Sequence, residues 1–189
     1  MAVPHIDLEL EKKEILKRYT ALLRPLSDKI DKKEKLQIRK AFDLALDAHK
    51  DMRRKSGEPY IYHPIAVAQI AVSEMGLGAT AVVCALLHDT VEDTHITLSD
   101  IEDLFGKEVR LIIDGLTKIP EVFDDKASIQ AENFRKMILT ISDDFRVVLI
   151  KLADRLHNAR TWDFIAPETA QRKAKETIDI YAPLAHRLG

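Results

Sequence analysis

Apolar residues recur at intervals of three and four along most of this 189-residue chain, and the alternating pattern of a β-strand is almost absent. Such spacing places apolar side chains on one face of an α-helix. Only six glycines and seven prolines interrupt the pattern. With 46% hydrophobic residues, the chain has enough apolar material for a sizeable core. The sequence therefore predicts an all-α helical bundle that forms a single domain over residues 1–189.

Residues that start or stop helices set the expected boundaries. A first amphipathic helix ends near Pro25, and a second runs from about Lys33 to about Arg53, with Gly57 soon after. Pro64 is placed as the first residue of a third helix, which continues to Glu74. Further helices are expected at about 79–89, 97–106, 108–118, 129–142, 144–163 and 167–187. Residues 120–128 lack periodicity and are predicted to form a mobile loop.

Charge and cysteine content exclude several classes of protein. The 29 basic and 31 acidic residues nearly balance, so no general nucleic-acid or anionic-membrane surface is indicated. The single cysteine, Cys84, lies in an apolar run and is predicted to be a core residue. One cysteine cannot form an intrachain disulfide, as is typical of a reducing compartment. No apolar run approaches the roughly 20 residues of a membrane span. We therefore expect a cytoplasmic protein that binds neither nucleic acid nor membrane.

An acidic segment follows the most apolar helix of the chain. That helix ends in His88 and Asp89, and Glu92 and Asp93 come directly afterwards. Burying such a cluster costs several kcal/mol unless a partner compensates the charge, and a divalent cation would do so. If the helix continues, Glu92 lies one turn beyond His88 and Asp93 one turn beyond Asp89. His88 and Asp89 would then bind a metal, and the carboxylates one turn later would act on a water molecule bound to that metal. A solvated helix end is the alternative for this segment alone.

Two more segments carry candidate metal ligands. His63 stands at the entrance to a helix, where helix capping is the alternative role. Asp154 shares a helical stripe with Asn158 and Thr161, and a salt bridge to Arg155 or Lys151 is its alternative role. The packing face of that helix is predicted to consist of Leu149, Leu152, Ala153 and Leu156.

Taken together, these segments supply two imidazoles and two carboxylates, from His63, His88, Asp89 and Asp154. The two carboxylates neutralise a divalent ion. Mixed nitrogen and oxygen ligands suit manganese, iron or zinc better than calcium. The sequence thus predicts a metal site with positions left for water and a substrate.

A basic segment precedes His63. Arg53, Arg54 and Lys55 are followed by Ser56 and the flexible Gly57. An arginine side chain can both pair with phosphate and stack on a base, so the segment suits a polyphosphate or a nucleobase. The alternative is that the basic residues complement a helix C-terminus that Gly57 caps.

Three segments, 54–64, 88–94 and 151–158, resemble the hydrolase domain of the RelA/SpoT-homologue family, whose members make and degrade the alarmone (p)ppGpp. The similarity extends through residues 130–137 and 181–189. It implies the helical bundle of an HD-domain metal-dependent phosphohydrolase. The implied reaction is Mn²⁺-dependent hydrolysis of the 3′-diphosphate, which gives GDP or GTP and pyrophosphate.

The resemblance also implies the roles of individual residues. His63, His88, Asp89 and Asp154 would bind Mn²⁺, and Glu92 and Asp93 would orient or deprotonate the attacking water. The guanosine nucleotide would be held by Arg54, Lys55, Ser56, Asn158 and Thr161. Family members that have lost hydrolysis have degraded His-Asp and Glu-Asp pairs, and because His88–Asp89 and Glu92–Asp93 are both intact here, an active hydrolase is expected.

Long members of that family continue into a synthetase domain. We therefore expect residues 1–189 to be an N-terminal fragment of a bifunctional protein with a C-terminal synthetase domain. A free-standing small alarmone hydrolase is the alternative. Two other functions stay open: another HD-type nucleotide phosphohydrolase, such as an NADPH phosphatase, and a regulatory module that binds guanine nucleotides without turnover.

Overall fold

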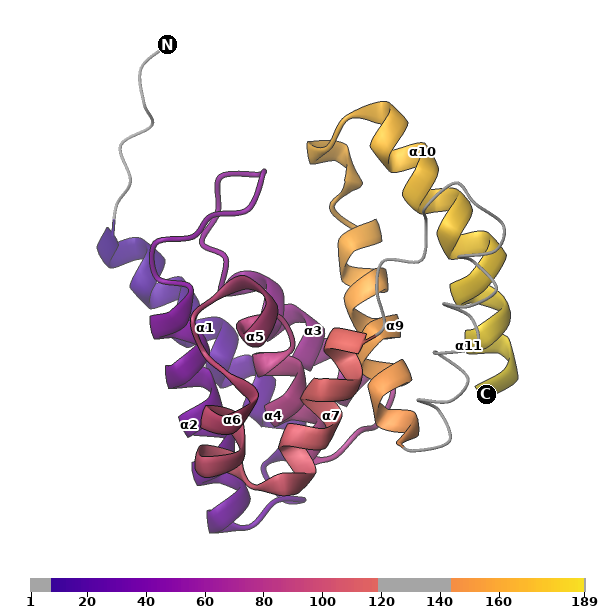
Figure 1. Cartoon of the computed structure of the whole chain (residues 1–189). Helices are drawn as coiled ribbons and strands as arrows, with labels where there is room; N and C mark the ends of the chain where they lie inside the picture. The colour runs from indigo at the N-terminus through magenta and orange to yellow at the C-terminus, as the bar shows by residue number, and fades with distance from the viewer. Residues whose placement is uncertain (1–7, 119–143, 189) are drawn as a thin grey trace.

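The computed structural model describes residues 8–118 and 144–188, and every regular element in these ranges is a helix (Figure 1). The predicted all-α fold is confirmed. The α-helices are α1 (Leu8–Leu23), α2 (Lys32–Ala48), α3 (Tyr62–Ser73), α4 (Ala79–Leu87), α5 (Thr90–Asp93), α6 (Leu98–Phe105), α7 (Lys107–Lys118), α9 (Phe145–Ala159), α10 (Pro167–Glu176) and α11 (Ala182–Leu188). Shorter turns are η1 (Arg24–Leu26), η2 (Trp162–Phe164) and the π-helical η3 (Thr177–Tyr181).

Helix α4 lies at the centre of the core. All of its residues except Thr80 are buried, which agrees with its apolar composition on every side. It packs against α2, α3, α7 and α9, while α3 also contacts α1 and α9. Figure 1 shows α9 between the bundle of α1–α7 and the C-terminal helices. The prediction that Cys84 is a core residue is confirmed, because its side chain is fully buried.

The predicted end of the second helix is wrong by five residues, since α2 stops at Ala48 instead of Arg53. His49 folds back, and its Nδ1 bonds the carbonyl of Ala45 at 2.9 Å. The chain then forms a narrow turn in which Arg53 bridges to Pro59. Gly57 lies in this turn with φ of +89°, a conformation that favours glycine, so it does not cap a helix.

The start of the third helix is earlier than predicted. Helix α3 begins at Tyr62, so Pro64 is its third residue. A proline is tolerated there because the N–H groups of the first turn have no intrahelical partner. His63 consequently lies inside the first turn, with its side chain buried.

The predicted helix at 79–89 does not continue unbroken into the acidic segment. Helix α4 ends at Leu87, and α5 begins at Thr90 after a kink at His88 and Asp89. The Asp93 amide still donates to the Asp89 carbonyl at 2.9 Å, so these two residues remain one turn apart.

The other helices lie close to their predicted positions. Helix α6 begins after a Thr97–Asp100 capping box and ends before Gly106. Helix α9 ends at Ala159, four residues before its predicted end. Its packing face includes the predicted Leu152, Ala153 and Leu156, together with Val147, Val148 and Ile150, while Leu149 is half-buried. The predicted loop at 120–128 and helix at 129–142 lie outside the described residues.

A buried ion pair joins α9 to the C-terminal helices. Arg155 Nη2 lies 3.0 Å from Glu176 Oε2, and the guanidinium stacks over the Tyr181 ring. Both charged side chains are almost fully buried. Of the two alternative salt-bridge partners of Asp154, Arg155 pairs with Glu176, whereas the charge of Asp154 raises the pKa of Lys151 above its usual value. No helix in the described ranges is both long and apolar enough to cross a membrane.

Candidate metal centre

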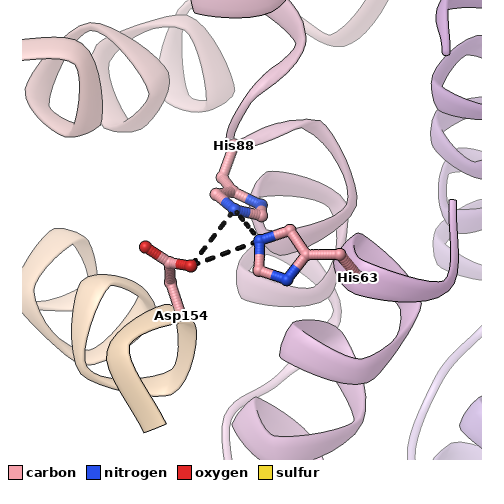
Figure 2. Close-up of side chains that lie close together, drawn as sticks. All are labelled: His63, His88 and Asp154. Atoms are coloured by element: carbon pink, nitrogen blue, oxygen red, sulfur yellow. Dashed lines mark hydrogen bonds and ion pairs between the residues drawn. The ribbon is translucent and has the colours of Figure 1, made fainter. Parts of the chain in front are cut away.

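Three predicted ligands converge from three separate elements (Figure 2). His63 comes from the first turn of α3, His88 from the end of α4 and Asp154 from the middle of α9. The two imidazole Nε2 atoms are 3.2 Å apart, and Asp154 Oδ1 lies 3.2 Å from the first and 3.8 Å from the second. All three donor atoms lie within 4.8 Å of one another, a spacing that one metal ion can bridge.

Asp89 completes the predicted set. Its Oδ1 lies 3.1 Å from His88 Nε2, and its Oδ2 lies 3.4 Å from His63 Nε2. The kink between α4 and α5 directs this carboxylate toward both imidazoles. The structure thus brings together all four residues that the sequence singled out as ligands.

Hydrogen bonds on the far side of each imidazole leave its Nε2 lone pair for the cluster. His88 Nδ1 donates to the Ala85 carbonyl at 2.8 Å, which fixes its tautomer. His63 Nδ1 lies 2.8 Å from His157 Nδ1. Burial, together with His63 and Arg54, lowers the pKa of His157 to about 4, so its ring is neutral, and the tautomers of the two rings decide which nitrogen donates. When His63 Nδ1 is the donor, two nitrogen lone pairs and two carboxylates face one another.

Such a group of acceptors favours a positive charge at its centre. Burial opposes protonation of His88, yet Asp89 and Asp154 outweigh it and raise the pKa of His88 to about 9. Burial likewise opposes ionisation of Asp154, but His63 and His88 hold its pKa below the usual value. A divalent cation matches this donor set of two nitrogens and two carboxylates. The residues present therefore fit a metal ion.

A pocket of about 460 Å³ opens beside the cluster and contains most of the other predicted site residues. Its wall includes the predicted Arg54, Lys55, Ser56, Glu92, Asn158 and Thr161, together with His63, Asp89 and Asp154. Tyr60, Lys151, Trp162, Phe164 and Tyr181 are also part of the wall. The basic segment and the metal cluster thus face one cavity.

Asn158 connects the two ends of that cavity. Its Oδ1 accepts a hydrogen bond from Arg54 Nη2 at 2.8 Å, and its Nδ2 donates to Asp154 Oδ1 at 2.6 Å. Arg54 Nη2 also lies 3.5 Å from Thr161 Oγ1. These contacts hold the Arg54 guanidinium at the pocket wall.

The two acidic residues predicted to act on water occupy different positions. Glu92 lines the pocket, where partial burial raises its pKa and Lys151 opposes that rise. Asp93 is not part of the pocket wall, and its Oδ2 instead accepts a hydrogen bond from the Tyr60 hydroxyl at 2.9 Å. Burial and the nearby Asp89 charge raise the pKa of Tyr60 far above its usual value, so this hydroxyl stays protonated.

Sequence reasoning gave no role to Tyr60 or His157, and it considered Lys151 only as an alternative salt-bridge partner of Asp154, although all three lie in the quoted motifs. Lys151 and His157 stand three residues before and after Asp154, so helical spacing could have placed both beside it. Burial opposes the charge on Lys151, but Asp154, Glu92 and Asp89 raise its pKa above the usual value. The aromatic residues of the pocket wall gave no such signal. Trp162, Phe164 and Tyr181 lie beyond the end of α9, where the spacing of that helix no longer applies.

The chain is similar to known proteins over most of its length. Residues 41–189 match the family described as the HD domain. The chain is 52% identical over 154 residues to the bifunctional (p)ppGpp synthase/hydrolase SpoT of Escherichia coli K12, a match that covers 81% of this chain and 22% of that protein. It is 45% identical over 175 residues to a GTP pyrophosphokinase of Streptomyces coelicolor, covering 93% and 20% respectively. The chain therefore spans about a fifth of the length of these relatives.

A solved structure shares the fold. It is described as a metazoan orthologue of SpoT that hydrolyses ppGpp, and it matches with a TM-score of 0.61 and 29% sequence identity. The match covers 76% of this chain and 84% of that one.

Proposed function

Because this chain belongs to the HD-domain family, we propose that it is a metal-dependent phosphohydrolase that removes the 3′-diphosphate from the alarmone (p)ppGpp. The products are GDP or GTP and pyrophosphate. The names of the SpoT relatives and of the metazoan structure support this substrate. Since the bacterial relatives are much longer and one is named a synthase/hydrolase, our proposal includes a synthetase domain C-terminal to this region.

One observation carries the proposal: three residues of the cluster, His63, Asp89 and Asp154, line the same pocket as the Arg54 segment. A guanosine nucleotide held at the Arg54 end would extend its 3′-diphosphate toward His63, His88, Asp89 and Asp154. Asn158 contacts both Arg54 and Asp154, so it sets the separation between the two ends. Lys55, Ser56 and Thr161 supply further polar groups along the nucleotide.

We propose Mn²⁺ as the resident ion, since mixed imidazole and carboxylate ligands suit it better than calcium. A divalent ion at such a site supplies a Lewis acid that acidifies water and polarises a phosphoryl oxygen. Glu92 faces the pocket and is the group that orients the attacking water and accepts its proton. The charged Lys151 offsets the negative charge that develops on the departing pyrophosphate.

Isotope labelling is expected to show which bond breaks. With ppGpp, Mn²⁺ and ¹⁸O-labelled water, the label should enter pyrophosphate and leave GDP unlabelled, because water attacks the phosphorus nearest the ribose. Mass spectrometry of both products measures this. Orthophosphate as the first product would indicate a different HD-type phosphohydrolase. Nucleotide binding without turnover would indicate a regulatory module.

Replacing Arg54 with alanine is expected to weaken substrate binding and to change kcat little. Its guanidinium lies over the nucleotide end of the pocket, where a lost charged hydrogen bond of about 1.5–3 kcal/mol corresponds to a roughly 10- to 100-fold rise in KM. Steady-state kinetics with ppGpp separate KM from kcat. Arg39→Ala is the matched control, since Arg39 is exposed on α2 and pairs with Asp43. A fall in kcat with an unchanged KM would contradict the proposed orientation of the nucleotide.

A further inference from the structure

The Tyr60 hydroxyl lies between two carboxylates that belong to different parts of the site. It is 2.7 Å from Asp89 Oδ2 and 2.9 Å from Asp93 Oδ2. Tyr60 is in the connection between α2 and α3, whereas the two aspartates lie one turn apart at α5. The Tyr60 side chain thus contacts both Asp89, a proposed metal ligand, and Asp93, which lies outside the pocket wall.

A phenolic hydroxyl carries a single hydrogen, whereas an ionised carboxylate can only accept. Tyr60 therefore donates to Asp89 or to Asp93, but not to both at the same moment. The same Asp89 Oδ2 atom lies 3.4 Å from His63 Nε2, so it faces the centre of the metal cluster as well. A cation that withdraws electron density from this oxygen makes it a poorer acceptor, and the hydroxyl then favours Asp93.

The surrounding rings restrict the movement of the Tyr60 side chain. The buried His49 ring stacks parallel on it, with centroids 4.7 Å apart and an interplanar angle of 9°. The His63 ring meets its edge at 5.9 Å. His49 is itself held by the Ala45 carbonyl. Because the ring is clamped, the hydroxyl changes its acceptor by rotation about the C–O bond alone.

Asp93 is well placed to be that second acceptor. Its side chain is exposed, and the Tyr60 hydroxyl is its only side-chain hydrogen-bond partner among the described residues. Its amide donates to the Asp89 carbonyl, so its distance from Asp89 is fixed by the helical turn. Asp93 can thus accept the hydrogen bond from the Tyr60 hydroxyl without any movement of the backbone.

We propose that Tyr60 is a positioning residue that couples Asp93 to Asp89 and thereby tunes the affinity of the metal site. Asp93 acts through this hydroxyl on Asp89, and Glu92 alone acts on water. The inference rests on the proposed metal site, but not on the identity of the nucleotide. It predicts that loss of the hydroxyl and loss of the Asp93 charge disturb metal binding by the same route.

The test is Mn²⁺ titration calorimetry without nucleotide, on Tyr60→Phe, Asp93→Asn and the double variant. Asp93→Asn should raise the Mn²⁺ dissociation constant about tenfold, the lower end of the range for residues that orient metal ligands, because the hydroxyl then stays on Asp89 and competes with the ion. Tyr60→Phe should lower the constant by about threefold or more, because it removes that competitor from Asp89. The double variant should bind Mn²⁺ as Tyr60→Phe does, because without the hydroxyl the Asp93 change has nothing to act through. Tyr62→Phe is the control, because it removes the same chemical group from a tyrosine whose ring lies under Arg18.

The outcomes separate this inference from the proposed function. Unsubstituted protein that binds no Mn²⁺ would refute the metal site itself. If that protein binds Mn²⁺, a shift below about threefold in either single variant would overturn the role of Tyr60. Effects that multiply in the double variant would overturn the coupling. Asp93 is exposed, so Asp93→Asn keeps the test informative even if Tyr60→Phe is poorly folded.

Discussion

An Asp89→Ala variant is expected to retain no stoichiometric metal and to show no measurable turnover. The change removes a carboxylate that lies 3.1 Å and 3.4 Å from the two imidazoles. It also removes one of the two negative charges that would neutralise a divalent ion. Because Asp154 remains, the cluster keeps three donors but not its charge balance. Metal analysis of the purified variant and a ppGpp hydrolysis assay measure the two effects.

Asp43→Ala is the matched control for this change, because Asp43 is exposed on α2 and pairs with Arg39. Circular dichroism checks that both variants keep their helices. His63→Ala should resemble Asp89→Ala with a smaller loss, since both carboxylates stay in place. Stoichiometric metal in Asp89→Ala protein would show that Asp89 is not a ligand.

The second large effect is expected for Glu92→Gln, with turnover reduced by about 10²- to 10⁴-fold, the usual range for a lost acid–base group. The substitution keeps the shape of the side chain and removes its ability to accept a proton. Metal content should stay close to that of the unsubstituted protein, because Glu92 makes none of the contacts that join the four proposed ligands. The measurement is kcat at saturating Mn²⁺, together with metal analysis.

Glu102→Gln provides the control, since Glu102 is exposed on α6 and is not part of the pocket wall. A rate in Glu92→Gln equal to that of the unsubstituted protein would exclude Glu92 from the proton transfer. Loss of metal in the same variant would instead make Glu92 a ligand.

Apolar spacing and chain-breaking residues were sufficient to predict the helices, because burial of one face is what stabilises them. Their ends were less predictable. Helix α2 ends five residues early because the His49 imidazole bonds the Ala45 carbonyl and stacks on Tyr60, which lies beyond the helix. A contact of this kind depends on tertiary packing, so periodicity within α2 could not reveal it.

The candidate ligands were predictable because each stands at a point where an apolar segment meets a polar one. The contacts of the residues beside them were less predictable. Asp154 is followed directly by Arg155, and sequence alone could not show that Arg155 pairs with Glu176 instead. Likewise, nothing in the order of the motifs indicated that Tyr60 would bridge Asp89 and Asp93.

The pairing of Arg155 with Glu176 sets a lower limit on the length at which this chain can fold autonomously. A truncation before Glu176 would remove both the ion-pair partner of Arg155 and the Tyr181 ring that covers its guanidinium, next to Asp154 in the sequence. With the helices kept, loss of the Glu176 carboxylate alone would leave a buried unpaired charge, which destabilises a protein by about 3–5 kcal/mol, a large part of the usual stability of a domain. Helix α10 carries no ligand, yet it belongs to the smallest unit that can keep the metal site intact.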